Sequence, residues 1–496
     1  MSDAGATQRH YRADCPSCGA PVEFLSAQST HAVCAYCKST VVREGDVLKR
    51  IGKMAELIDD HGLLQLGASG QADGQGFTLV GRLQYGYPEG TWSEWHALLS
   101  DGSSAWLSED NGAYVFSRPV QDQLEVPAAD RFSVGNSTTV GGQRYTVTSS
   151  QRVALLSAEG ELPRMPDLGA EFSVVELRSQ GGDVAAARVL SIDYGSQPPE
   201  LSLGRAVELA DLNMRGLKGE SAAQGRGRQL TCPNCGSPVE VKLESSQSIT
   251  CPQCNALIDL SQGVAGELKH ALQDEPVRPA IALGKVGQLD GIHWQVVGFQ
   301  HRMGQSPGDD ESFGWSEYLL YNAKKGFAFL VDSEEGWSFV RPTTGAPEMA
   351  AGGQSARYGG ATYRLQWAYR AETTYALGEF YWRVQRGQVT QNRDFAAGDR
   401  LLSLEQSPNE LTWSAGSKLA YAVVAKAFGL SPSGGSAMRA DAGPFTPARS
   451  VSVVTIIIVL LVVLLLLWLI SSSSGGSGVR TGGGSFGGFS TGGGHK

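Results

Sequence analysis

Apolar and polar residues alternate with a period of two along two long stretches of the chain, residues 63–210 and 280–425. A period of two is typical of β-strands with one buried face. Asp101-Gly102 and Asn111-Gly112 interrupt the first stretch, and such pairs favour two-residue hairpin turns. The clearest predicted strands are residues 77–80, 92–99, 104–107, 114–116, 143–147, 153–156, 171–177 and 187–192. We therefore expect a mainly β protein built from antiparallel modules of the barrel or sandwich type.

The second stretch repeats the first with a period of about 220 residues. Trp92-Ser93-Glu94-Trp95 matches Trp315-Ser316-Glu317-Tyr318, and residues 114–119 match residues 337–342, because both segments end in Arg-Pro. Shorter matches join residues 142–145 to 360–363, 169–172 to 378–380, and 200–202 to 410–412. The matches predict a tandem duplication in which the two halves share one fold.

One connecting segment shows helical spacing instead. Apolar residues fall at positions 47, 48, 51, 54, 55 and 58, which predicts a short helix within residues 44–62. The segment from 199 to 214 is also compatible with a helix.

All eight cysteines fall into two sets of four with one spacing, in which fifteen residues separate two C-x-x-C pairs. The first set is Cys15, Cys18, Cys34 and Cys37, and the second set is Cys232, Cys235, Cys251 and Cys254. Four thiolates on two facing knuckles match the closed tetrahedral shell of structural zinc. The sequence therefore predicts two zinc ribbons, whose metal supplies the folding energy that so small a core lacks.

Other uses of the cysteines remain open. They are disulfides, buried free thiols, a redox C-x-x-C pair and an iron–sulfur centre. No βαβ pattern surrounds either set, which argues against a thioredoxin-like site. Gly19 and Gly236 directly follow a knuckle and suit a turn with positive φ. Four cysteine ligands leave no open coordination position, so we predict that zinc does not catalyse a reaction here.

A ribbon followed by a module with W-S-E-[WY] and Arg-Pro motifs resembles the bacterial family called domain of unknown function 4178. The resemblance covers most of residues 63–210 and 280–425, and zinc ribbons commonly accompany this family. It implies a bacterial source and often a neighbouring membrane. It implies no established activity and no catalytic residues.

Residues 451–470 form an uncharged apolar run, in which only Ser452 and Thr455 are polar. As a helix this run is about 30 Å long, which matches one bilayer core. Arg449 and other basic residues precede the run, which favours a cytosolic N-terminal side. Residues 1–12 lack the apolar core of a secretory signal, and reduced thiols suit the cytosol. We expect a single-pass protein of the inner or plasma membrane, with its N-terminal domains cytoplasmic and a short C-terminal tail outside.

These predictions divide the chain into consecutive segments. They are a disordered start (1–12), zinc ribbon 1 (13–43), a connecting helix (44–62), β module 1 (63–214), a linker (215–229), zinc ribbon 2 (230–261), a connector (262–279), β module 2 (280–430), a linker (431–450), a transmembrane helix (451–470) and a disordered Gly/Ser-rich tail (471–496).

The charge pattern and the motifs narrow the function. A net charge of −9 argues against nucleic-acid binding over the whole chain, and the basic residues near 215–228 lie in a Gly/Ser-rich linker. No P-loop, G-x-S-x-G or H-E-x-x-H motif is present, nor a G-x-G-x-x-G in a strand–helix setting. His96 follows the first motif, but Leu319 stands at its place in the second, which weakens a Glu–His acid–base pair.

The tryptophan–glutamate motifs provide the candidate surface for a ligand or partner. On a strand, Trp92 and Glu94 share one face, where an indole and a carboxylate can attract a cation. The residues concerned are Trp92, Glu94, Trp95, Trp315, Glu317 and Tyr318. The alternative interpretation is that they are ordinary sheet residues whose carboxylates have structural partners.

Three functions follow. The leading one is a non-enzymatic scaffold, tethered at the cytoplasmic face of a bacterial membrane, that presents a surface to a protein partner. The second is a small-ligand-binding or enzymatic β module in which Glu94 and Glu317 line a pocket and have shifted pKa values. The third is nucleic-acid binding through the ribbons, which requires a basic face with exposed aromatic residues.

Overall fold

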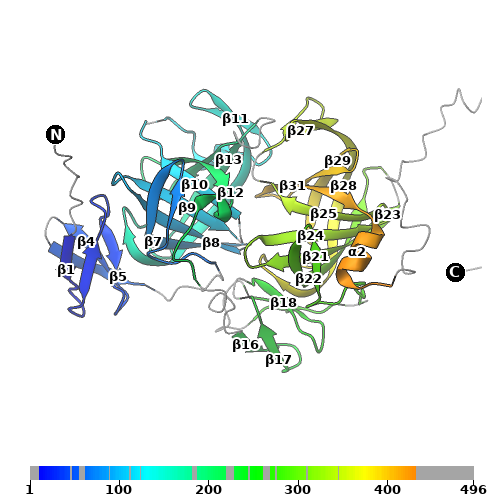
Figure 1. Cartoon of the computed structure of the whole chain (residues 1–496), viewed down its shortest axis with the longest axis horizontal. Coiled ribbons are helices and arrows are strands. Elements are labelled where there is room, and N and C mark those ends of the chain that lie inside the picture. Colours follow the sequence, from blue (N-terminus) through cyan, green and yellow to red (C-terminus); the bar gives the residue numbers. More distant parts are fainter. Residues whose placement is uncertain are drawn as a thin grey trace, which may run out of the picture. The chain divides into compact units, whose positions relative to one another are not determined.

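The computed structural model describes residues 11–431 apart from short gaps (Figure 1). The gaps are residues 45–46, 55–61, 89, 111–112, 123, 181–186, 219–227, 244–245, 261–267, 274–275, 309–310 and 344–345. Within the described residues the chain is mainly β and contains two closed eight-stranded barrels in tandem. The predicted β class and duplication are therefore confirmed, and the modules are barrels rather than sandwiches.

The first barrel is an antiparallel ring in the order β12-β13-β14-β15-β10-β9-β8-β7, closed by pairing between β12 and β7. Its strands are β7 (Gln75–Tyr87), β8 (Gly90–Leu99), β9 (Ser104–Asp110), β10 (Ala113–Pro119), β12 (Gln143–Leu162), β13 (Glu171–Ser179), β14 (Val189–Asp193) and β15 (Glu200–Val207). Two short strands, β6 (Ser69–Ala72) and β11 (Ser137–Val140), extend the sheet.

The second barrel repeats this ring as β28-β29-β30-β31-β25-β24-β23-β22, closed between β28 and β22. Its strands are β22 (Ile292–Gln305), β23 (Ser312–Asn322), β24 (Gly326–Ser333), β25 (Gly336–Pro342), β28 (Ala361–Phe380), β29 (Val389–Ala397), β30 (Arg400–Gln406) and β31 (Leu411–Leu419). The added strands are β21 (Val286–Leu289), β26 (Glu348–Met349) and β27 (Ser355–Tyr358).

Each ribbon is joined to its own barrel by strand pairing. In the first half β3 pairs with the end of β12, and in the second half β18 pairs with the end of β28. The first ribbon has β1 (Tyr11–Asp14), β2 (Pro21–Phe24), β3 (His31–Val33), β4 (Ser39–Glu44) and β5 (Val47–Lys53). The second has β16 (Arg228–Thr231), β17 (Pro238–Val241), β18 (Ser248–Thr250), β19 (Leu257–Asp259) and β20 (His270–Ala271).

In each half a glycine lies on the long strand, β12 or β28, near the place where this strand pairs with both a barrel strand and a ribbon strand. Gly160 has φ +71° and Gly378 has φ +86°. A Cβ at Gly160 would lie 2.2 Å from the carbonyl oxygen of Val80, and one at Gly378 would lie 2.3 Å from that of Val297. Only glycine therefore fits this close crossing of two backbones.

The outer faces of the barrels carry much of the apolar core. In the first barrel Trp95 and Leu107 pack there against Leu64 and Leu212 from flanking segments. In the second barrel the short helix α2 (Tyr421–Phe428) buries Val424 and Phe428 against the equivalent face. Helix α2 ends at Gly429, and the sequence prediction of an all-β second module did not include it.

Two predicted helical segments are strands instead. Residues Val47–Lys53 form β5, which pairs with β4, so the helix predicted at 44–62 is wrong there; residues 55–61 lie outside the described residues. Leu48 faces the ribbon core while Val47 and Ile51 stay exposed, so the helical spacing of apolar residues was coincidental. Residues Glu200–Val207 form β15, because the ring needs a strand between β10 and β14, and only Leu209–Leu212 makes a 3₁₀ turn, η2. A second such turn, η1, spans Ala129–Arg131.

The predicted membrane span at 451–470, the tail at 471–496 and residues 1–10 of the predicted disordered start all lie outside the described residues. The start was predicted as 1–12, which is wrong at Tyr11 and Arg12, because these residues belong to β1 and pair with β2. Among the residues that the structure does describe, no helix is long and apolar enough to cross a bilayer.

Candidate metal centres and barrel interiors

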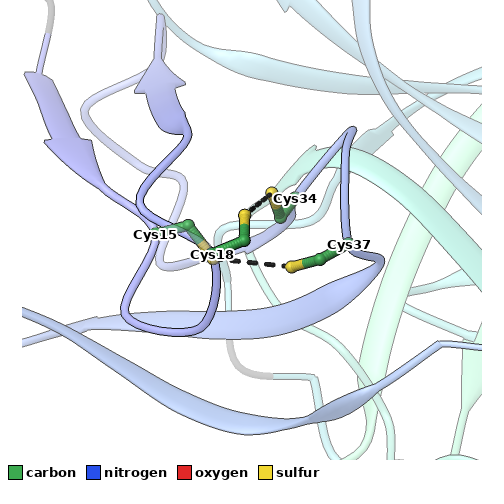
Figure 2. Close-up of side chains that lie close together, drawn as sticks. All are labelled: Cys15, Cys18, Cys34 and Cys37. Atoms are coloured by element: carbon green, nitrogen blue, oxygen red, sulfur yellow. Dashed lines mark hydrogen bonds between the residues drawn. The ribbon is translucent and has the colours of Figure 1, made fainter.

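The eight cysteines come together as two clusters of four, as predicted. In the first ribbon, Cys15 and Cys18 lie on the β1–β2 turn and face Cys34 and Cys37 on the β3–β4 turn (Figure 2). The second ribbon groups Cys232, Cys235, Cys251 and Cys254 in the same way. In each cluster all four sulfurs lie within 4.8 Å of one another.

The sulfur spacing fits one tetrahedral metal ion. Cys15 Sγ lies 3.7 Å from Cys37 Sγ, and Cys18 Sγ lies 3.7 Å from Cys34 Sγ. Zinc–sulfur bonds of about 2.3 Å in a tetrahedron place the sulfurs about 3.8 Å apart. The eight thiols are free, which contradicts the disulfide alternative. The residues therefore fit zinc, held by four ligands with no open position.

Local hydrogen bonds favour the thiolate form of one cysteine in each cluster. The hydroxyl and backbone N–H of Ser39 donate to Cys37 and lower the pKa of its thiol to about 6. Ser237 does the same for Cys235 and lowers the pKa of that thiol to about 6. The predicted turns are also present, because Gly19 and Gly236 both have φ +74°. Thiolates are the form that binds metal, so these contacts favour the binding form of Cys37 and Cys235. In the second cluster burial raises the pKa of the Cys232 thiol to about 11. In the first cluster the backbone N–H of Ala20 acts to lower the pKa of the Cys18 thiol, but the neighbouring thiols outweigh it and raise this pKa.

A buried glutamate ties each ribbon to its barrel, and sequence reasoning missed it. Glu161 on β12 accepts hydrogen bonds from the backbone N–H groups of Leu25 and Ser26 at 2.9 and 3.2 Å. Glu379 on β28 accepts bonds at 3.0 and 2.8 Å from the N–H groups of Lys242 and Leu243. We call this glutamate the ribbon latch in each half.

The latch corrects one sequence match. Residues 378–380 were matched with 169–172, which pairs Glu379 with Glu171. In the structure the counterpart is Glu161, because Gly160-Glu161 and Gly378-Glu379 share the positive φ, the close backbone crossing and the bonds to the ribbon. Glu171 is an exposed residue of β13 paired with Arg152. Gly160-Glu161 and Gly169-Ala170-Glu171 lie within twelve residues of one another, so a short glycine–glutamate match could not distinguish the two.

The first tryptophan and the glutamate of each motif point into the barrel. In the second barrel Arg302 of β22 contacts Glu405 of β30 at 2.8 Å, although β28 and β29 separate these strands around the ring. Such a contact requires both side chains to face inward. Trp315 lies directly opposite Arg302 in the β22–β23 register, and Glu317 lies 3.6 Å from Arg302, so the motif shares this inner face.

The second barrel pairs the buried Arg302 with its own carboxylates, although Nε of this guanidinium has no hydrogen-bond partner among the described residues. The guanidinium carbon of Arg302 lies 5.6 Å from the ring centre of Trp315, and the Arg302 side chain is only 4% exposed. Trp315 donates its indole N–H to Glu317 at 2.6 Å, and Gln300 donates to the same carboxylate. Glu317 is therefore paired structurally, as the alternative interpretation of the motif expected.

The first barrel differs at these positions. Tyr85 stands opposite Trp92, at the place that Arg302 has in the second barrel. Glu94 is half-buried, and its pKa is raised to about 7 by burial and by the nearby Asp193, with Arg164 opposing. The Trp92 indole N–H donates to this carboxylate at 3.5 Å. The second hypothesis requires both motif carboxylates to line a pocket with shifted pKa values, and a raised pKa at Glu94 meets only one part of it.

The last aromatic residue of each motif does not belong to the candidate surface for a ligand or partner. Trp95 is fully buried on the outer face and donates its indole N–H to Glu109 at 3.0 Å. Tyr318 is also buried, and its hydroxyl accepts the backbone N–H of Ala280. His96 is a neutral core residue, because burial lowers its pKa to about 4. Strand alternation places these side chains in the core, so Trp95 and Tyr318 are withdrawn from the candidate surface.

Two closed β-barrels, each joined by strand pairing to a four-cysteine ribbon, define a tandem barrel protein with two tetrathiolate centres. The model of the family described as Domain of unknown function (DUF4178) matches residues 65–209 and 282–420. The chain therefore belongs to this family, and each match covers one barrel. Comparison with curated proteins and with solved structures finds no match.

Proposed function

We propose that the chain is a non-enzymatic binding protein, anchored at the cytoplasmic face of a membrane by residues 451–470. The two ribbons hold structural zinc, and the two barrels present the binding surfaces to a protein partner or a ligand. The observation that carries this proposal is the closed four-sulfur cluster in a ribbon that is latched onto its barrel.

The site chemistry supports a structural rather than a catalytic use of the metal. Four sulfurs already occupy the tetrahedral positions, so no position is left for water or substrate. Bound zinc would link the two knuckles of a ribbon, whose strands are only three to seven residues long in the first half. The ribbon in turn adds its strands to the edge of the barrel sheet.

Metal analysis of the full-length protein in detergent tests the zinc part. We expect two zinc ions per chain, one after Cys34→Ser and one after Cys251→Ser. The control is Ser103→Ala, at an exposed turn, which should keep both ions. Iron in place of zinc, no metal, or mutually oxidised thiols would refute this part.

Fractionation and crosslinking test the binding part. The intact chain should sediment with membranes and resist carbonate extraction, whereas deletion of 451–470 should release it. Crosslinking in native membranes should give one reproducible adduct with the intact chain. A chain in which either barrel is disrupted should not form it. A chain that stays monomeric, or that binds nucleic acid with a steep salt dependence, would count against the proposal.

A further inference from the structure

The polar residues inside the two barrels differ at one decisive position. Tyr85 and Arg302 occupy equivalent places, each directly opposite the first tryptophan of the motif. In the second barrel, the Arg302 guanidinium stacks on Trp315 and pairs with Glu317. That barrel therefore contains its own bound cation, positioned between an indole and a carboxylate.

The first barrel keeps the indole and the carboxylate but has no cation at that place. Tyr85 is 2% exposed, and its hydroxyl oxygen is buried without a hydrogen-bond partner among the described residues. The nearby Arg164 already forms ion pairs with Asp193 and with Glu200. Glu94 is thus left beside Trp92 without a close ion pair within the described part of the chain.

The proposed contact residues lie at the end of the first barrel away from the β3–β12 pairing. The ribbon pairs with β12 at Gly160, opposite Gly81 of β7, and Tyr85 lies four residues farther along β7, about 13 Å away. Trp92 lies opposite Tyr85 on β8, and Val33 of the ribbon belongs to the same apolar cluster as Tyr85. Trp92, Tyr87 and Glu94 are half-buried rather than enclosed. The rings of Trp92 and Tyr87 lie 5.5 Å apart, and those of Trp92 and Tyr85 lie 5.2 Å apart, so aromatic rings surround Trp92 at this end.

We propose that this end of the first barrel binds an organic cation, a primary ammonium or a guanidinium, with Glu94 as its counter-ion and Trp92 as its stacking surface. Cation–π attraction and a half-buried carboxylate are the two contacts that Arg302 receives in the second barrel. The cation belongs either to a small free amine or to a lysine or arginine side chain of a peptide. This inference deepens the proposed binding function and names the ligand class of one barrel.

Binding should depend on pH because Glu94 must be ionised. Tyr85 from β7, Asp193 from β14, Glu200 from β15 and Arg164 from the β12–β13 connection face it. With the pKa of Glu94 at about 7, its ionised fraction rises about tenfold from pH 6 to pH 8. Amines and guanidines stay charged over this range, so the affinity should rise about tenfold.

The test is titration of the full-length protein in detergent, followed by tryptophan fluorescence and calorimetry. The probes are butylammonium, butylguanidinium, and capped Gly-Lys-Gly and Gly-Arg-Gly peptides, with neutral 1-pentanol as the uncharged analogue. Binding of the free cations alone supports a small-molecule source, and binding of the peptides alone supports a side-chain source. Absence of binding by all four cations, or equal binding of the alcohol, overturns the proposal.

Variants locate the site. Glu94→Gln should weaken cation binding at least tenfold at pH 8 and abolish its pH dependence, whereas Glu317→Gln in the second barrel should leave the affinity unchanged. Tyr85→Arg should supply an internal guanidinium and block the probes. Circular dichroism and zinc content check the fold of each variant. Unchanged binding in folded Glu94→Gln or Tyr85→Arg refutes the site, while two bound zinc ions and membrane association would still support the broader function.

Discussion

Replacing the ribbon latch of the first half should loosen the ribbon without disturbing the cysteines. Glu161→Leu removes both carboxylate oxygens and keeps a side chain of similar size. The backbone N–H groups of Leu25 and Ser26 then lose their acceptor at a buried site, since they bond to Glu161 at 2.9 and 3.2 Å. Glu161 itself is only 3% exposed.

The expected loss of stability follows from these contacts. A buried donor without a partner costs about 1–3 kcal/mol, so two donors cost about 4 kcal/mol. Burial raises the pKa of Glu161, which means that the ionised side chain already has a desolvation cost that leucine does not have. We therefore expect a net loss of about 2–3 kcal/mol for docking of the ribbon.

Hydrogen exchange of the full-length protein measures this effect at the residues concerned. The amides of peptides that contain Leu25 and Ser26 should exchange on the order of a hundredfold faster, since each 1.4 kcal/mol is about a factor of ten. The matched control is Glu171→Leu, because Glu171 is 63% exposed and lies on the neighbouring strand. Its surface ion pair should contribute below about 1 kcal/mol.

The pair of variants also decides which glutamate corresponds to Glu379. If Glu171→Leu accelerates exchange in the ribbon and Glu161→Leu does not, the assignment of the latch is wrong. If neither variant does, the ribbon is held by strand pairing between β3 and β12 alone.

Two further predictions concern the barrels. Because the pKa of Glu94 is raised, the protonated side chain contributes stability below about pH 4.5, and this contribution is lost as the pH rises through 7. The free energy of unfolding of Glu94→Gln, measured in urea, should therefore rise by about 2 kcal/mol relative to wild type between pH 5 and pH 8. A constant difference across this range would contradict the assigned burial. Gly378→Ala should destabilise the second barrel by more than about 2 kcal/mol, because the new Cβ meets the Val297 carbonyl oxygen at 2.3 Å, whereas Gly360→Ala, with no atom within 4 Å, should cost less in the same thermal melt.

The sequence predicted the local features that depend on short spacing. Cysteine spacing identified both clusters, and period-two alternation located β8 and its neighbours. Alternation also assigned Trp92 and Glu94 to one face. It could not say that this face is the inside of a closed ring, because closure depends on β12 pairing with β7, about seventy residues away in the chain.

Other features depended on tertiary pairing and were missed for that reason. The apolar residues of β5 have helical spacing, but this segment pairs with β4, and the tertiary pairing overrides the local helical preference. The latch is one glutamate whose role appears only when the ribbon folds back onto β12. Likewise, nothing local distinguishes Glu94 from Glu317, and their difference comes from Tyr85 and Arg302 on the adjacent strand.

Comparison of the two halves distinguishes the residues that hold each ribbon on its barrel from the residues that differ inside the barrels. The halves share the cysteine spacing, the latch and the glycine at the backbone crossing, all of which hold the ribbon on the barrel. They differ inside the barrel, where the second half fills the space beside its tryptophan with Arg302. The buried Arg302 pairs with Glu317 and Glu405 and occupies the position that a ligand cation would need. The duplication therefore gives the two barrels different side chains beside the same tryptophan, Tyr85 in the first and Arg302 in the second. The proposed cation site predicts that an added cation perturbs Trp92 and not Trp315.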